Sequence, residues 1–125
     1  MTASARAREL LTIAAIAADA KQGEDLVGLD VSGPLPLTDI FFLASGRNER
    51  NVQAIAGEIE DKLLGIGVKA LRREGRAEGR WILLDFGDLV AHVFHEEDRT
   101  YYSLERLWKD CPAIPLEIPA VSSPE

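Results

Sequence analysis

The chain has 125 residues, enough for one domain with a modest core, and 46% hydrophobic with 28% charged residues is ordinary for a soluble globular protein. A formal net charge of −7 argues against non-specific nucleic-acid binding, which depends on Lys and Arg neutralising phosphates, and favours a basic protein partner. The one cysteine, Cys111, excludes an intrachain disulfide, and no apolar run is long enough to span a membrane.

The first half of the chain predicts two helices and two strands. Residues 4–21 are rich in alanine, the best helix former, and repeat apolar residues at helical spacing. Short apolar runs at residues 26–31 and 40–44 predict strands. Residues 48–64 predict the second helix and have the clearest periodicity in the chain. Its apolar face would consist of Val52, Ile55, Ala56, Ile59 and Leu63.

The second half is organised around two apolar runs, residues 81–86 and 89–94. Only a Gly87-Asp88 step separates them, which predicts an antiparallel hairpin. A weaker strand is expected at residues 68–73. The last predicted helix would carry Leu104, Leu107 and Trp108. This order predicts an α/β single domain with a mixed five-stranded sheet flanked by helices, in which residues 48–64 bridge a parallel pair.

Both faces of the strand at residues 81–86 are apolar. Successive side chains of a strand point to opposite faces. One face would carry Ile82, Leu84 and Phe86, and the other Trp81, Leu83 and Asp85. Helices on one side of the sheet would leave a Trp and a Leu without a cover. This surplus of apolar surface predicts a partner-binding face.

The last 15 residues differ in composition from the rest. Residues 111–125 hold four of the six prolines and no helical pattern, so we expect a domain over residues 1–110 and an extended or disordered tail. Truncation after Trp108 would then leave the fold nearly intact. The alternative is that the alternating residues Ile114, Leu116 and Ile118 lie along a groove.

Catalytic chemistry has weak support. Ser45-Gly46 before a helix could bind phosphate through free backbone N–H groups, but an ordinary Ser N-cap is favoured. Glu58 and Glu60 do not face each other on a helix, and Asp85 and Asp88 meet only if their turn curls back. We therefore expect no catalytic residue and no cofactor. The rival hypothesis is an enzyme that uses Ser45-Gly46 and Asp85.

Neither the histidines nor the arginines predict a dedicated site. His92 and His95 fall on opposite faces of a strand and cannot share a metal ion, so we expect no metal site and a hydrogen-bonded His92 in the core or at its rim. Cys111 is expected to be an ordinary reduced thiol. A local basic cluster is favoured as a solvated face, with a minor contact to RNA or an acidic patch as the alternative. It consists of Arg72, Arg73, Arg76 and Arg80.

The order of motifs between Thr38 and Trp108 is distinctive. Thr38-Asp39 is followed by FFLASGRNERNVQAIAGEIEDKL, then by EG, and then by RWILLDFGDLVAHVFHEEDRTYYSLERLW. These motifs resemble the ribosomal silencing factor family, also called the RsfS or Iojap family. The resemblance covers about residues 10–108, departs from the family at residues 48–51, and leaves out the proline-rich tail. Its most specific positions are Trp81, Asp85, Gly87-Asp88, His92-Val93, Tyr102, Leu104-Glu105 and Leu107-Trp108.

The resemblance implies a nucleotidyltransferase-like fold without known catalysis. It also implies a cytoplasmic translation repressor that binds the large ribosomal subunit through ribosomal protein L-fourteen and keeps the small subunit from joining. The docking surface would lie around Trp81 and Phe86. From their places in the strand we expect both rings to be anchors, with Phe86 reaching the rim beside Gly87, and the alternative is that both rings belong to the core. The arginine cluster would make at most a minor contact to ribosomal RNA. The predicted partner-binding residues are Arg80, Trp81, Leu83, Asp85, Phe86 and Asp88. A homodimeric scaffold that uses the same face is a third hypothesis.

Overall fold

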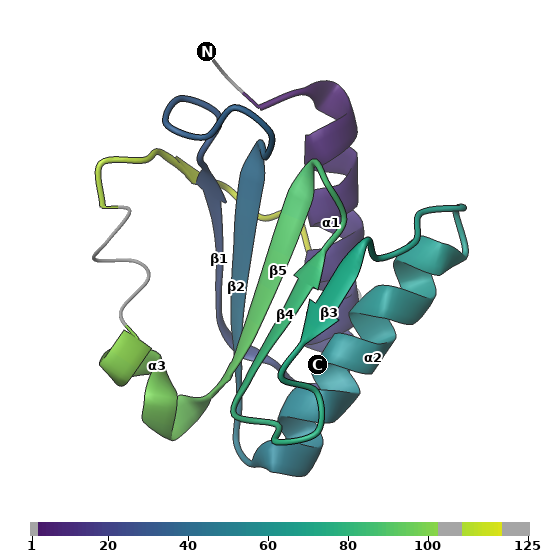
Figure 1. Ribbon diagram of the computed structural model, residues 1–125, viewed down its shortest axis with the longest axis vertical. Coiled ribbons are helices and arrows are strands. Elements are labelled where there is room, and N and C mark those ends of the chain that lie inside the picture. The colour runs from purple at the N-terminus through teal and green to yellow at the C-terminus, as the bar shows by residue number, and fades with distance from the viewer. Residues whose placement is uncertain (1–2, 103–108, 119–125) are drawn as a thin grey trace, which may run out of the picture.

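The computed structural model describes residues 3–102 and 109–118, and within these residues it contains three helices and six strands (Figure 1). In chain order they are α1 (Ala5–Ala20), β1 (Glu24–Asp30), β2 (Ile40–Gly46), α2 (Glu49–Leu64), β3 (Arg72–Glu74), β4 (Trp81–Asp85), β5 (Leu89–His95), α3 (Glu96–Tyr102) and β6 (Ala113–Ile114). None of the described helices is both long and apolar enough to cross a membrane. The predicted helix residues Leu104, Leu107 and Trp108 lie outside the described residues.

The strands form one mixed sheet in the order β3-β4-β5-β2-β1-β6. β2 and β5 are parallel and are joined through α2, and the other pairs are antiparallel. The predicted mixed sheet with one bridged parallel pair is confirmed. The predicted number of five strands is wrong because the sheet has a sixth strand, β6.

The β4–β5 hairpin is confirmed. The N–H of Phe86 donates to the carbonyl of Leu89 at 2.8 Å, so Gly87 and Asp88 form a two-residue loop. Gly87 has φ +88°, and a glycine at this first loop position is typical of the tight turns that match strand twist. The strand predicted at residues 68–73 is shorter and later than expected. Val68 still belongs to the turn that ends α2, because its N–H donates to the carbonyl of Leu63 at 2.9 Å.

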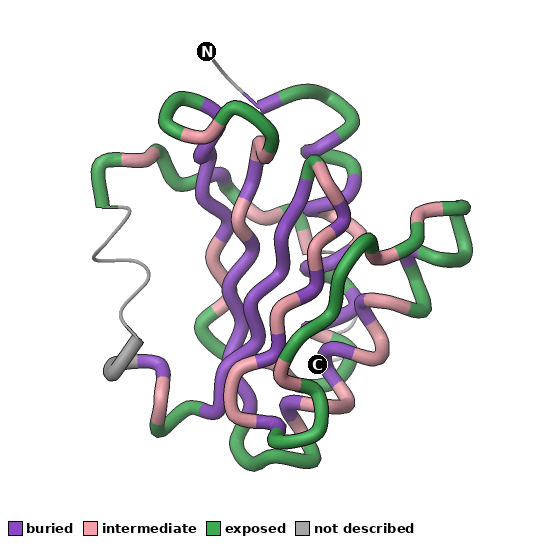
Figure 2. Tube along the Cα trace, in the orientation of Figure 1, coloured by how far each residue is buried: buried purple, intermediate pink, exposed green. Residues whose placement is uncertain are grey.

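Helices α1 and α2 cover one face of the sheet (Figure 1). The predicted apolar face of α2 is confirmed, since Val52, Ile55, Ala56, Ile59 and Leu63 are all fully buried. In α1 the buried residues are mostly alanines, which let the helix lie close to the strands. Figure 2 shows the central strands β2 and β5 almost entirely buried, while β3 at the sheet edge is exposed.

The segment after Asp110 packs on the domain over residues 113–118, which corrects the expectation of a loose tail. β6 pairs with β1, with Ile114 opposite Gly28, and Ile114 is only 8% exposed. Leu116 and Ile118 pack against the same core. A Cβ at Gly28 would lie 2.9 Å from Leu11 and 3.4 Å from Leu116, so this glycine makes room for both side chains. This packing agrees with the alternative in which Ile114, Leu116 and Ile118 lie along the domain. Residues 119–125 lie outside the described residues.

Candidate partner-binding face

The sheet face opposite α1 and α2 carries a second set of apolar side chains, which we call the open face. Apart from α3 at one end, none of the described helices packs on it (Figure 1), but Leu35 and Cys111 pack against part of it. Leu43 and Phe94 are fully buried, so the accessible part of this face lies mainly along β4. Strand register and alternation place on it Trp81, Leu83 and Asp85 from β4, Val90, His92 and Phe94 from β5, Phe41, Leu43 and Ser45 from β2, and Val27 and Leu29 from β1.

Strand β4 shows the alternation that the sequence predicts. Ile82 and Leu84 are fully buried in the core beneath the helices. Trp81, Leu83 and Asp85 are half-buried on the open face. Two apolar side chains and a carboxylate are therefore accessible side by side along one strand.

The Trp81 side chain is held in place before any partner arrives. Its indole N–H donates to Nδ1 of His92 at 3.2 Å. Its ring stacks on Phe94, with centroids 5.4 Å apart and planes inclined by 27°. A fixed aromatic ring loses little conformational entropy on binding, which suits an interface anchor.

His92 is the polar centre of the open face. It is 5% exposed and makes an edge contact with Phe41, with ring centroids 4.8 Å apart. The prediction of a hydrogen-bonded histidine in the core or at its rim is confirmed. Burial lowers the pKa of His92 to about 4, so the ring is neutral at physiological pH.

This burial predicts a pH-dependent stability. The unfolded chain binds a proton at His92 near pH 6.5, whereas the folded chain resists it until about pH 4. The free energy of unfolding should therefore fall by up to about 3 kcal/mol as the pH drops through this interval. His92→Asn keeps an acceptor near the position of Nδ1 for the indole but does not titrate. Urea unfolding at several pH values should show a steeper loss for the parent chain than for His92→Asn, and parallel curves would contradict the expectation.

Phe86 is not on the open face, which corrects its predicted role as an anchor at the rim. It is 6% exposed and belongs to the core with Ile82 and Leu84. The alternation of β4 continues through residue 86, and the chain reverses only at Gly87. The Phe86 ring therefore stays on the helix-covered side.

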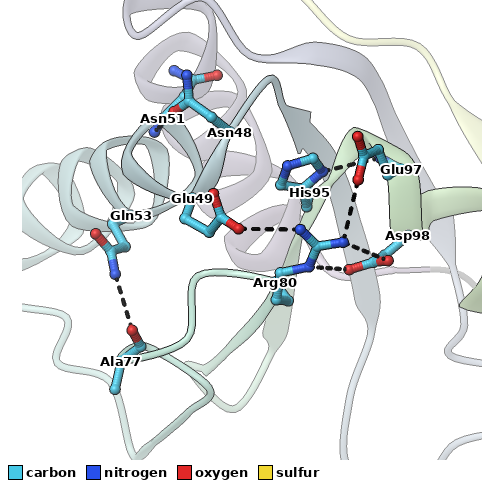
Figure 3. A network of polar contacts seen from close by, with 9 residues as sticks. All are labelled: Asn48, Glu49, Asn51, Gln53, Ala77, Arg80, His95, Glu97 and Asp98. Atoms are coloured by element: carbon cyan, nitrogen blue, oxygen red, sulfur yellow. Dashed lines mark hydrogen bonds and ion pairs between the residues drawn. The ribbon is translucent and has the colours of Figure 1, made fainter.

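Arg80 is engaged with three carboxylates of its own chain (Figure 3). Its Nε and Nη2 donate to the two oxygens of Asp98 at 2.7 and 3.0 Å, and its Nη1 donates to Glu49 at 3.1 Å. Glu97 lies 3.5 Å from Nη2. The hydrogen bonds that Arg80 donates to Asp98 raise the pKa of Arg80 above its usual value. Arg80 thus ties the start of β4 to α2 and α3 and is a positioning residue, rather than a free cation for a partner.

Arg99 is a second arginine that positions α3, and the sequence reasoning missed it. It is 8% exposed, donates to Oγ of Ser45 at 2.6 Å and to the carbonyl of Asp25 at 2.8 Å, and lies 5.9 Å from the centre of the Phe94 ring. These partners are 54 and 74 positions away in sequence, so no local pattern could have shown them. Together Arg80 and Arg99 fix α3 across one end of the open face.

The Ser45-Gly46 step does not form a phosphate cradle. Ser45 is 1% exposed and its hydroxyl accepts from Arg99. A Cβ at Gly46 would lie 2.9 Å from the backbone nitrogen of Val52, so the step packs directly against α2. The expected Ser N-cap is also wrong, because the side chain of Asn48 caps α2 by accepting from the N–H of Asn51 at 2.7 Å.

Asp85 and Asp88, the carboxylates considered for an enzyme, lie at the turn of the β4–β5 hairpin. Oδ1 of Asp85 accepts from the N–H of Gly87 at 2.8 Å, while Asp88 is exposed in the loop. Among residues 3–102 and 109–118, no three His, Cys, Asp or Glu side chains lie together in a way that suits a metal ion. His95 lies at the far end of β5, where its Nδ1 accepts from the N–H of Glu97 at 3.1 Å.

The remaining arginines near β3 are exposed and lie beside acidic residues. Arg73 and Arg76 both contact Glu60, and Arg72 lies 3.4 Å from Glu74. This arrangement agrees with a solvated face. Such exposed pairs contribute little to stability.

Comparison with known proteins identifies the family. A family model described as "Ribosomal silencing factor during starvation" matches residues 4–125. The chain belongs to this family. A relative named ribosomal silencing factor RsfS from Bacillus subtilis (strain 168) is 44% identical over 110 residues, which are 88% of this chain and 93% of that protein.

Solved structures of similar proteins agree with the fold of this family member. A crystal structure from Bacillus halodurans is 42% identical, with a TM-score of 0.77 over 86% of this chain and 98% of that chain. One from Chromobacterium violaceum is 33% identical, with a TM-score of 0.79 over 90% of this chain and 92% of that chain. The family match also runs beyond residue 108, so the resemblance extends into the tail that the sequence analysis left out.

Proposed function

We propose that this chain is a cytoplasmic ribosomal silencing factor that binds the large ribosomal subunit through ribosomal protein L-fourteen. Bound there, it would keep the small subunit from joining and so repress translation. The observation that carries this proposal is the family match over residues 4–125, together with relatives named ribosomal silencing factor. The mechanism is steric and needs no catalytic residue or cofactor.

The open face is the surface that we assign to this docking. Trp81 and Leu83 supply apolar contact, and Asp85 with the exposed Asp88 supplies negative charge at its edge. An interface of standard size buries about 1,600 Å² in total and takes most of its energy from a few such anchors. The net charge of −7 should also speed the encounter with a basic ribosomal protein. Arg80 would act indirectly, through the position of α3.

Sedimentation with purified subunits tests the proposal. The protein should co-sediment with large subunits and not with small subunits, and in excess it should lower the fraction of joined ribosomes in a sucrose gradient. Unchanged joining at saturating protein would overturn it. Pull-down of purified ribosomal protein L-fourteen then tests the named partner directly.

Replacing the anchor gives a residue-level test. Trp81→Ala should remain folded, because the ring is only half-buried, but should weaken binding to the large subunit about thirtyfold or more. Leu37→Ala is a suitable control, since Leu37 is 85% exposed and lies in the loop between β1 and β2. Normal binding by a folded Trp81→Ala protein would remove Trp81 from the interface. Light scattering on both variants would also show whether a homodimer uses the same face.

A further inference from the structure

The open face contains a buried hydrogen-bond donor that has no acceptor in the part of the chain that the structure describes. An indole N–H can only donate, so the 3.2 Å contact from Trp81 requires Nδ1 of His92 to be the acceptor. A neutral imidazole with an acceptor at Nδ1 carries its proton on Nε2. Nε2 is buried and has no hydrogen-bond partner among residues 3–102 and 109–118. The hydrogen bond from Trp81 thus fixes the tautomer of His92 and places the unused N–H on Nε2.

The described neighbours of His92 offer this donor no acceptor. In the register of the sheet it lies between Leu43 and Leu83, and the Phe41 ring is in edge contact with it. A buried water needs two or more polar partners, and these apolar side chains offer none. A buried donor without an acceptor is costly and rare, so it calls for a specific reason.

We propose that His92 is a specificity-determining residue of the open face, whose Nε2–H donates to a carbonyl oxygen of the docked protein segment. This inference rests on the proposed function, because it assigns a contact within the same docking surface. A neutral carbonyl suits the site better than a carboxylate, since the imidazole is uncharged and the chain already carries a net charge of −7. A partner with only apolar side chains at this point would leave the donor unpaired and would bind less well.

The donor lies deeper in the open face than the side chains around it. His92 is 5% exposed, whereas Phe41, Trp81 and Leu83 around it are half-buried. The docked segment meets these outer side chains first, and its carbonyl oxygen contacts Nε2 after one of them changes rotamer. The fixed tautomer leaves the N–H as the one polar group that His92 offers to this partner.

Two amide substitutions separate the two ring nitrogens. His92→Asn places an acceptor near the position of Nδ1 for the Trp81 indole but lacks a donor at Nε2. His92→Gln extends an amide N–H toward the position of Nε2. We expect His92→Asn to weaken binding to the large ribosomal subunit about tenfold, and His92→Gln to recover most of that loss. Equal affinities for the parent chain and a folded His92→Asn protein would overturn the inference while the proposed function stands.

Nuclear magnetic resonance of the ¹⁵N-labelled imidazole tests the same contact without a mutation. The free protein should show the Nε2–H tautomer, and purified ribosomal protein L-fourteen should shift the Nε2 proton downfield as the new hydrogen bond forms. An unmoved resonance at saturation, or the opposite tautomer, would refute the role of His92 even if His92→Asn does not fold. Absence of any binding by the parent chain would refute the proposed function and this inference together.

Discussion

Phe86→Ala is expected to lower the free energy of unfolding by about 3–5 kcal/mol, because it removes a large ring from the packed core. The ring is 6% exposed and lies among core residues such as Ile82 and Leu84. The cost combines the lost burial of apolar surface with the cavity that the surrounding helices and strands cannot fill. Urea or thermal unfolding followed by circular dichroism measures it directly.

The same variant also separates a core role from an anchor role. Molecules of Phe86→Ala that remain folded should bind the large subunit nearly as well as the parent chain, since the ring does not reach the open face. Leu71→Ala is a useful control, because Leu71 is 74% exposed near the same hairpin and should change stability by less than about 0.5 kcal/mol. A stable Phe86→Ala protein with weak binding would restore the role predicted from the sequence.

Local patterns in the sequence predicted most of the architecture. The hairpin followed from a Gly-Asp step between apolar runs, and the buried face of α2 followed from its helical repeat. The alternation in β4 correctly assigned Ile82 and Leu84 to the core and Trp81 and Leu83 to the other face. These features depend on residues a few positions apart, where side-chain direction is set by backbone geometry.

Apart from Phe86, the features that the sequence did not predict have a different cause, which is contact between distant elements. The predicted role of Phe86 was wrong because strand alternation, which places its ring on the same side as Ile82 and Leu84, still holds at the end of the strand. The roles of Arg80 and Arg99 depend on carboxylates, a hydroxyl and a carbonyl that the fold brings from other elements. Ser45 looked like a cap in sequence, but the position of α3 brings Arg99 onto its hydroxyl. Patterns of residue spacing do not predict contacts between residues that lie this far apart in the sequence.

The sixth strand was missed for the same reason. Four prolines argued for a loose tail, yet Pro112 and Pro115 flank a two-residue strand rather than interrupt it. The edge of β1 supplies the hydrogen-bonding partners, and the sequence alone does not show which strand edge of the sheet is left unpaired. The carbonyl of Pro112 accepts from the N–H of Asp30 at 2.8 Å, so even the flanking proline takes part in the pairing.

Removing residues 111–125 is therefore expected to destabilise the domain. The deletion unpairs the outer edge of β1 and exposes the core surface that Ile114, Leu116 and Ile118 cover. Ile114→Ala alone should cost about 2–5 kcal/mol, the usual range for a buried isoleucine, and the deletion should cost at least as much. An exposed strand edge also invites association between chains, so the truncated protein should aggregate more readily on heating.

A matched variant within the segment controls for effects of composition. Glu117→Ala changes an exposed side chain between two packed ones and should leave the melting temperature nearly unchanged. Differential scanning calorimetry of the parent chain, Ile114→Ala, Glu117→Ala and the deletion compares all four under one condition. If Ile114→Ala and the deletion melt with the parent chain, residues 113–118 do not hold the β1 edge in solution. If both melt well below it while Glu117→Ala does not, the proline-rich segment is part of the folded domain, because its isoleucine side chain and backbone complete the sheet.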